Sequence, residues 1–474
     1  MGRFQAPAWN SRPQLLLDGL ALCIADIQGL WAVLFVYCTS PTHEGGLGMH
    51  VSVAGGAMLV QGLLSTLLGP VIGRLHDRTT KKRYLFGALP VMLIVITWGM
   101  INFSRDVTIV LMALLIQGIA GGAYPPGICA LSFGVVGTAD FPQRASRNEM
   151  WKHAGAVITA GILPIFLVDS EEGGWATYFL VMVCVNISAL VLLSPLRDSD
   201  IVDHDNGPMA IEQGAPVADG LHHAVVPIKE LLSRPEIILF MLSVTMFHLG
   251  NAAMLPQLGY KVDQLYNTNN TAGTSVAYFG ASLELDGKNA IGVATIISQV
   301  VMIPVAKFSG TLASSPYVGS KKLLMFGCVV LIIRGFWIAT AHNSETLLWS
   351  SVLDGVAAGI FGVCSILLMS DLTEGTGQFA TMQGMVATCL GLGSSISHGL
   401  AGEITEEQGV DFTMFFLAGL ACIPVVLLIF VPDRRCHWGF HPIRGTFDEK
   451  KVLLHDALYT DTRYTDNQAY EVPA

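Results

Sequence analysis

The chain has 474 residues, of which 52% are hydrophobic and only 13% are charged. Soluble domains carry roughly 25% charged residues, so this composition excludes an ordinary soluble protein. The net charge of −10 offers no basic surface for nucleic acid, and we expect no nucleic-acid partner. The nine cysteines contain no CxxC pair, so neither a metal site nor a disulfide framework is expected.

Long apolar runs occur along almost the whole chain. A run of about 18 or more apolar residues predicts a transmembrane helix, because a hydrocarbon core ~30 Å thick needs about 20 helical residues. No barrel-like alternation appears, so helices are expected throughout. The predicted spans are residues 14–38, 50–73, 84–103, 107–137, 149–168, 175–195, 236–258, 289–309, 322–342, 346–369, 379–401 and 412–431. The sequence therefore predicts an all-α membrane protein with twelve transmembrane helices.

The distribution of basic residues predicts the orientation. With both termini in the cytoplasm, 22 of the 26 Lys and Arg lie on or near the inner side; the other four are Arg105, Lys261, Lys288 and Arg334. Basic residues accumulate in cytoplasmic loops, so we expect cytoplasmic termini. The plasma membrane is favoured over an internal membrane.

Polar stretches divide the chain into four parts. We expect an N-terminal six-helix bundle over residues 1–195, a cytoplasmic linker over 196–235, a C-terminal six-helix bundle over 236–431, and a disordered cytoplasmic tail over 432–474. The predicted outer loop 259–288 contains the glycosylation sequon Asn269-Asn270-Thr271.

The two halves repeat each other, as in transporters built from structural repeats. GRLHDRTTKKR (73–83) follows the second span, and GTLASSPYVGSKK (310–322) follows the eighth. Both contain Gly-x-Leu and then a basic pair. Polar cytoplasmic turns also follow the fourth and tenth spans, TADFPQRASRNEM (138–150) and SDLTEGTGQFATMQG (370–384).

GRLHDRTTKKR resembles the loop motif between helices two and three of the major facilitator superfamily. The matching residues are Gly73, Leu75, Asp77, Arg78, Lys81 and Lys82. Segments such as LCIADIQG and FHLGNAAMLP resemble a mainly microbial branch to which no substrate can be assigned. The resemblance implies two six-helix bundles around a central cavity, the major facilitator fold. It does not extend to the helix-four signature Arg-x-x-Gln-Gly, where Leu114 takes the place of the arginine.

The motif predicts a conformational latch at the inner end of the second span. Asp77 can face a helix N-terminus or an arginine of the other bundle, with Arg78 and Lys82 beside it, and Gly73 allows close helix approach. The alternative is that these basic residues only set the topology.

Charged residues inside spans are functional candidates, because each costs ~2.5–3.5 kcal/mol on insertion scales. Asp26, followed by Gln28, lies mid-span and is the first candidate for a proton- or cation-coupling carboxylate. Arg334 and Asp354 lie at similar depth in spans nine and ten, so they can meet, either as a structural ion pair or at a functional site.

Other polar residues are candidates for solute binding. His248 and Asn251 are three apart and share a helix face, and Tyr124 lies in the helix-breaking sequence GGAYPPG. In the family that the chain resembles, helices one, four, seven and ten line the cavity. This implies that Asp26, Gln117, His248, Asn251 and Asp354 point inward. Simple packing is the alternative for each.

These features favour a secondary active transporter that moves a small solute by alternating access. Neither a nucleotide-binding segment nor a cofactor motif nor a catalytic signature is present, so we expect no cofactor and no enzyme activity. A proton or another ion is the candidate coupling partner. Efflux is slightly favoured over uptake, because the candidates contain no basic cluster. The alternative function is a non-transporting membrane sensor or receptor on a transporter fold.

Overall fold

The computed structural model describes residues 10–39, 42, 47–49, 51–103, 106–163, 174–201, 226–269, 275–278, 281–284, 287–315 and 317–432. For residues 25–36 it describes the helix but not the side chains. Most of the predicted linker and nearly all of the predicted tail lie outside these ranges.

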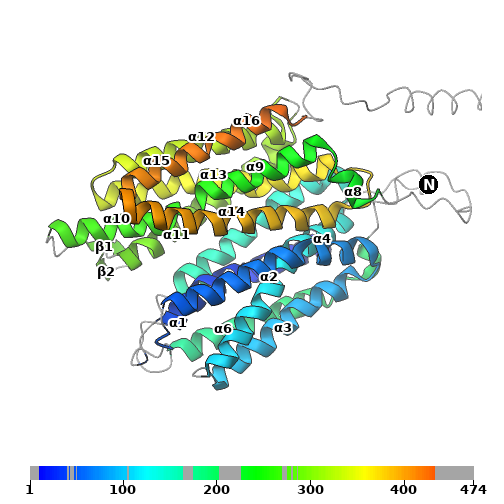
Figure 1. Cartoon of the computed structure of the whole chain (residues 1–474). Coiled ribbons are helices and arrows are strands. Elements are labelled where there is room, and N and C mark those ends of the chain that lie inside the picture. The colour runs from blue at the N-terminus through cyan, green and yellow to red at the C-terminus, as the bar shows by residue number, and fades with distance from the viewer. Residues whose placement is uncertain are drawn as a thin grey trace, which may run out of the picture. The chain divides into compact units, whose positions relative to one another are not determined.

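The first half of the chain is a bundle centred on one long helix (Figure 1). Its elements are α1 (Arg12–Thr39), α2 (Val51–Arg78), α3 (Lys82–Phe103), α4 (Val107–Ala156), the π-helical turn η2 (Val157–Ile162) and α6 (Gly174–Leu193). Helix α4 packs against α1, α2 and α3, and α3 packs against α6. Backbone groups must be paired internally in lipid, which explains why these apolar runs form helices.

The second half forms another bundle. Its helices are α8 (Ile228–Leu231), α9 (Pro235–Asn251), α10 (Met254–Asn269), α11 (Gly287–Ala313), α12 (Gly319–Thr340), α13 (Ser344–Leu372), α14 (Phe379–Gln408), α15 (Val410–Leu420) and α16 (Cys422–Phe430). Helix α13 packs against α11 and α12, and α9 packs against α14 and α16. Each of the twelve predicted spans coincides with helical structure in the described chain. Eight helical stretches of the described chain are long and apolar enough by composition alone to cross a membrane.

Helix α4 supplies both the fourth and the fifth predicted spans. Its two arms meet at Gly137, whose φ of 72° favours glycine. Residues 138–150, predicted as a polar turn, are therefore helical, and that prediction is wrong. The reason is Arg144: its side chain is fully buried and donates hydrogen bonds to Gln14, Asp18 and Asn148, so these charges hold α4 against α1.

Two other predicted loops are shorter than expected. Asp371 was placed in a polar turn but lies buried in the last turn of α13. The predicted outer loop begins with helix α10, which extends to Asn269. It also contains an antiparallel hairpin of β1 (Ser275–Tyr278) and β2 (Ala281–Glu284). Apart from this hairpin, the regular secondary structure of the described chain is helical, as the sequence predicts.

The repeated basic pairs have the same structural role in both halves. Arg83, at the start of α3, donates to the carbonyl oxygens of Ser194 and Leu196 just after α6. Lys321, at the start of α12, donates to the carbonyl oxygens of Ile429 and Val431 at the end of α16. Cations at a helix C-terminus satisfy its last carbonyls and oppose the helix dipole. Each bundle is thus closed on itself at this end, which we call the motif end because it carries residues 73–83.

The two halves meet along two helix pairs. Helix α2 packs against α14, and the second arm of α4 packs against α11. Figure 1 shows α2 beside α14. Helix α4 also contacts α14 and α13, so these contacts as well as the two main pairs must break for the halves to separate.

Candidate functional site

Asp77 joins the two halves at the motif end. Its carboxylate accepts hydrogen bonds from the backbone N–H groups of Ala380 (2.9 Å) and Thr381 (2.7 Å) and from the Thr381 hydroxyl. These residues are in the first turn of α14, where N–H groups have no partner within the helix and the dipole favours an anion. Burial raises the pKa of Asp77, while the hydrogen bonds from α14 act in the opposite direction.

Glycines allow α2 and α14 to touch backbone to backbone beside Asp77. A Cβ on Gly73 would lie 2.8 Å from the Cα of Thr381, and one on Gly69 would lie 2.8 Å from the carbonyl oxygen of Gly384. A Cβ on Gly384 would overlap the Gly69 carbonyl and lie 2.7 Å from the nitrogen of Pro70. We call Gly69, Gly73 and Gly384 the glycine seam. Only Gly73 could be predicted from the sequence, because the partners in this contact are more than 300 residues apart along the chain.

The two basic residues of the predicted latch lie differently. Lys82 is buried and interacts electrostatically with Asp77. Arg78 is exposed at the surface. The contact across the two halves is therefore built by Asp77 and the glycine seam, with Lys82 behind the carboxylate.

An aromatic cluster lies next to this contact. Phe133 and Phe141, on the two arms of α4, place their ring centroids 5.1 Å and 5.2 Å from that of Phe379 at the start of α14. Edge-on and tilted rings at such distances attract each other. The cluster closes the space between the halves at the motif end.

The second helix pair is held by a hydroxyl and a polar bridge. Ser146 on α4 donates to the carbonyl oxygens of Ala306 (2.7 Å) and Lys307 (3.1 Å) on α11. Two turns further along α4, His153 Nδ1 lies 2.7 Å from Gln299 Oε1 on α11.

Glu149, Lys152 and His153 form a buried charged cluster on the second arm of α4. Glu149 is in an ion pair with Lys152, and its Oε2 lies 3.7 Å from His153 Nε2. These residues were not among the predicted candidates, because they fall at the predicted start of a span. Their spacing of three and four was the available signal, since it places all three on one helix face.

Arg334 and Asp354 come together inside the second half. Arg334 Nη1 lies 2.6 Å from Asp354 Oδ1 and donates a second hydrogen bond of 2.8 Å to Asn251 Oδ1. Arg334 is 1% exposed, so its charge depends on these partners. Helix α9 ends at Asn251. The backbone N–H of Ala253, just after this end, donates a hydrogen bond to the hydroxyl of Ser397.

The remaining candidates are spread over both halves. Gln117 accepts a hydrogen bond of 2.9 Å from Gln61, within the first half. Tyr124 is buried beside Phe86. His248 meets the ring of Phe361 edge-on, with centroids 5.1 Å apart.

Some candidates lie outside the described structure. The side chains of Asp26 and Gln28 belong to the undescribed part of α1. Asn269 ends α10, and the rest of its sequon lies outside the described residues.

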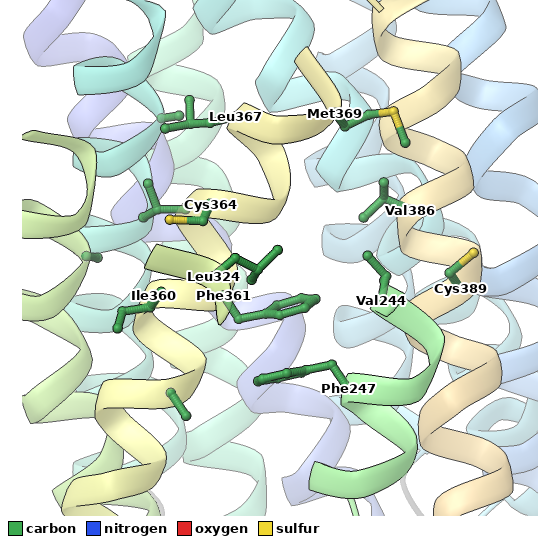
Figure 2. Close-up of a cluster of buried hydrophobic side chains, with 14 of the residues drawn as sticks. Val244, Phe247, Leu324, Ile360, Phe361, Cys364, Leu367, Met369, Val386 and Cys389 are labelled. Atoms are coloured by element: carbon green, nitrogen blue, oxygen red, sulfur yellow. The ribbon is translucent and has the colours of Figure 1, made fainter. Parts of the chain in front are cut away.

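An apolar wall lies beside His248. Phe247 of α9 and Phe361 of α13 stack with centroids 4.1 Å apart. Figure 2 shows the two rings face to face, with Val244 of α9 and Val386 and Cys389 of α14 nearby. These side chains are buried, so the wall packs aromatic and aliphatic groups next to the imidazole.

Comparisons with known proteins agree with this architecture. The family described as the Major Facilitator Superfamily matches residues 20–283 and again 264–460. An uncharacterized MFS-type transporter of Mycobacterium tuberculosis is 31% identical over 425 residues, covering 88% of this chain and 92% of the relative. The chain therefore belongs to the major facilitator superfamily, and it is an integral multi-pass membrane protein.

More distant matches extend the comparison. The quinolone resistance protein NorA of Staphylococcus aureus is 26% identical over 233 residues, 48% of this chain and 54% of that one. Among solved structures, the human organic anion transporter MFSD10 matches with a TM-score of 0.60 and 16% identity, covering 89% of this chain and all of that one. The transporter FucP, in the outward conformation, matches with a TM-score of 0.61 and 12% identity over 88% and 98% of the two chains. These two structures share the fold.

Proposed function

We propose that the protein is a proton-coupled secondary transporter that exports a small solute by alternating access. The observation that carries this proposal is the contact of Asp77 and the glycine seam with the first turn of α14. Each half is held together by its own internal contacts. The two halves are joined here by a few hydrogen bonds and by direct contact between glycine backbones. Such an interface can break and re-form without unfolding either half.

The direction and the solute class rest on the chemistry of the second half. The charge of Arg334 is already balanced by Asp354, so this arginine offers no spare positive charge to a strongly anionic solute. The wall of Phe247 and Phe361 beside His248 suits a solute with an apolar aromatic part. One relative is named for quinolone resistance, which fits export of such a molecule. We propose an amphipathic aromatic solute.

The proposed membrane orientation places the motif end in the cytoplasm. The basic residues concentrated there support this orientation, and we propose the plasma membrane as the location. The structure would then be closed toward the cytoplasm. Relatives named as transporters do not favour the sensor alternative.

The proposed site roles follow the geometry. Asp77, Gly73 and Lys82 hold the closed state. His248, Phe247 and Phe361 line the solute path, while Arg334, Asp354 and Asn251 hold α9, α12 and α13 in register. Asp26 remains a candidate for coupling.

Flux of a quinolone probe tests the function. The full chain is reconstituted into proteoliposomes, and movement of norfloxacin is followed with and without an imposed pH gradient. We expect accumulation against its gradient only when the pH gradient is present. Accumulation that ignores the pH gradient would refute proton coupling, and flux no greater than in empty liposomes would refute the solute class. Thermal-shift measurements with a panel of compounds then extend the search to other solutes. A ligand at 100 times its Kd stabilises the folded protein by about 2.7 kcal/mol, which such measurements detect.

Asp77→Asn is expected to slow transport without affecting membrane insertion. An amide has one acceptor oxygen where the carboxylate has two, and its NH₂ group would face the N–H groups of Ala380 and Thr381. Hydrogen bonds to charged groups contribute about 1.5–3 kcal/mol, so the closed state should become roughly 10- to 100-fold less populated. Initial rates of norfloxacin flux, normalised to inserted protein, measure the effect.

Asp106→Asn is the matched control. Asp106 also accepts a hydrogen bond at a helix N-terminus, from the Thr108 N–H at 2.8 Å, but within its own half. Its substitution should leave flux unchanged. An unchanged rate in Asp77→Asn would remove Asp77 from the latch.

A further inference from the structure

The cluster of Glu149, Lys152 and His153 has an unfilled hydrogen-bonding position. His153 Nδ1 lies 2.7 Å from the amide oxygen of Gln299, and an amide oxygen only accepts, so Nδ1 carries the hydrogen. In the neutral ring, Nε2 is then a bare acceptor. It is buried without a hydrogen-bond partner, and it faces Glu149 Oε2 at 3.7 Å. Buried polar atoms are normally paired, so this position suits one additional proton.

The cluster lies where both halves meet. Gln299 belongs to α11, and α13 presents Gly362, where a Cβ would lie only 2.9 Å from Glu149 Oε2. A side chain at position 362 would displace the carboxylate. The position of Glu149 therefore depends on the second half as well as on its own helix.

Few charged or titratable groups of the described residues interact with Glu149. On its own arm of α4 it interacts with Lys152 and His153, and on the first arm it interacts electrostatically with Tyr124 and Cys129. From the second half, Gly362 lies against Glu149, and the amide of Gln299 contacts His153. The ion pair of Glu149 with Lys152 is neutral overall.

We propose that Glu149 and His153 together form the binding site for the coupling proton, an assignment that rests on the proton-coupled transport proposed above. A proton from water on one side of the membrane adds to the lone pair of His153 Nε2, giving an imidazolium paired with the Glu149 carboxylate. The same proton leaves to water on the other side after the halves have moved, and no electron is transferred.

Proton binding changes the stability of the closed interface. The loaded cluster carries one net positive charge, which is costly in a dry contact and less costly in a hydrated one. Loading therefore favours separation of α4 from α11 around Gln299. This links the proton to the movement of the halves.

Flux measurements test the assignment. In proteoliposomes with norfloxacin, Glu149→Gln and His153→Gln should lose accumulation driven by a pH gradient by about 5- to 150-fold. Both should retain exchange of norfloxacin at equal pH on the two sides, and Glu149→Asp should recover part of the coupling. Glu406→Gln, an exposed carboxylate on α14, is the matched control and should behave as wild type.

Asp26→Asn supplies the competing outcome. If Asp26→Asn loses the pH-driven accumulation while Glu149→Gln and His153→Gln keep it, the assignment is overturned and proton coupling itself stands.

A second measurement needs no solute, so it distinguishes failure of this assignment from failure of the proposed function. Trp151 lies between Glu149 and Lys152 in the sequence. Its contribution to the tryptophan fluorescence is the difference in emission between wild type and Trp151→Phe. We expect this contribution to change with pH in wild type and in Glu406→Gln. It should be flat in Glu149→Gln and His153→Gln. An identical titration in all four proteins would overturn the assignment, even if wild type fails to move norfloxacin.

Discussion

Replacing Gly384 by alanine is expected to open the protein at the motif end. The new Cβ would overlap the Gly69 carbonyl and lie 2.7 Å from the nitrogen of Pro70, and both are backbone atoms that cannot rotate away. Overpacking of this kind costs about 1–3 kcal/mol, and here the strain exists only while α2 and α14 are in contact. The closed state should lose about 5- to 150-fold in population relative to the open one.

The distance between spin labels across the motif end measures this change. Exposed positions Thr80 in the first half and Glu374 in the second can carry the labels, in a background whose native cysteines are replaced. We expect a longer distance in Gly384→Ala. Gly399→Ala, on the same helix with no atom within 4 Å of its added Cβ, should match wild type. Equal distances in the two variants would show that the seam does not control closure.

Removing one partner of the Arg334–Asp354 pair is expected to destabilise the second bundle more than removing both. Asp354→Leu leaves a guanidinium that is 1% exposed and still donates a hydrogen bond to Asn251. Breaking a buried pair in this way costs about 3–5 kcal/mol, whereas replacing both charges by apolar groups is often neutral. Arg334→Met combined with Asp354→Leu should therefore recover most of the lost stability. Thermal unfolding in detergent compares both variants with wild type.

The ion pair of Lys261 with Asp411 is the control for this comparison. Its nitrogen and oxygen lie 2.7 Å apart, but the Asp411 side chain is 52% exposed, and Lys261 also donates to the carbonyl oxygens of Ile338 and Ala339. Asp411→Asn should cost less than about 1 kcal/mol. If the Asp354→Leu protein were as stable as the double variant, the pair would not hold the bundle.

The architecture could be predicted from the sequence because the bilayer imposes it. Apolar runs of sufficient length must be helical, and the two copies of Gly-x-Leu followed by basic residues marked the repeat. Their positions along spans nine and ten also predicted that Arg334 and Asp354 lie at similar depth in the membrane, and the structure brings them together. These features depend on local composition and on distance along a helix, which one sequence contains.

The contacts between the halves could not be predicted in the same way. The charges of residues 138–150 looked like a solvated turn, but Arg144 is buried because Gln14 and Asp18 of α1 supply its acceptors. The contacts of Glu149 with Gly362 and of His153 with Gln299 could not be predicted, because these partners lie far away in the chain. The aromatic contact of Phe379 with α4 is invisible for the same reason.

The caps and the buried arginine of the first bundle also bear on the order of biosynthesis. Arg83 finds its carbonyl partners at Ser194 and Leu196, and Arg144 finds its acceptors at Gln14, Asp18 and Asn148, all within the first 200 residues. The ribosome makes this half first, and domains generally fold as units during synthesis. The first bundle can thus satisfy its buried charges while the second is still being translated. Gly69 and Gly73 then stay exposed to lipid or water until α14 is inserted, so the last helices made complete the surface by which the two halves recognise each other.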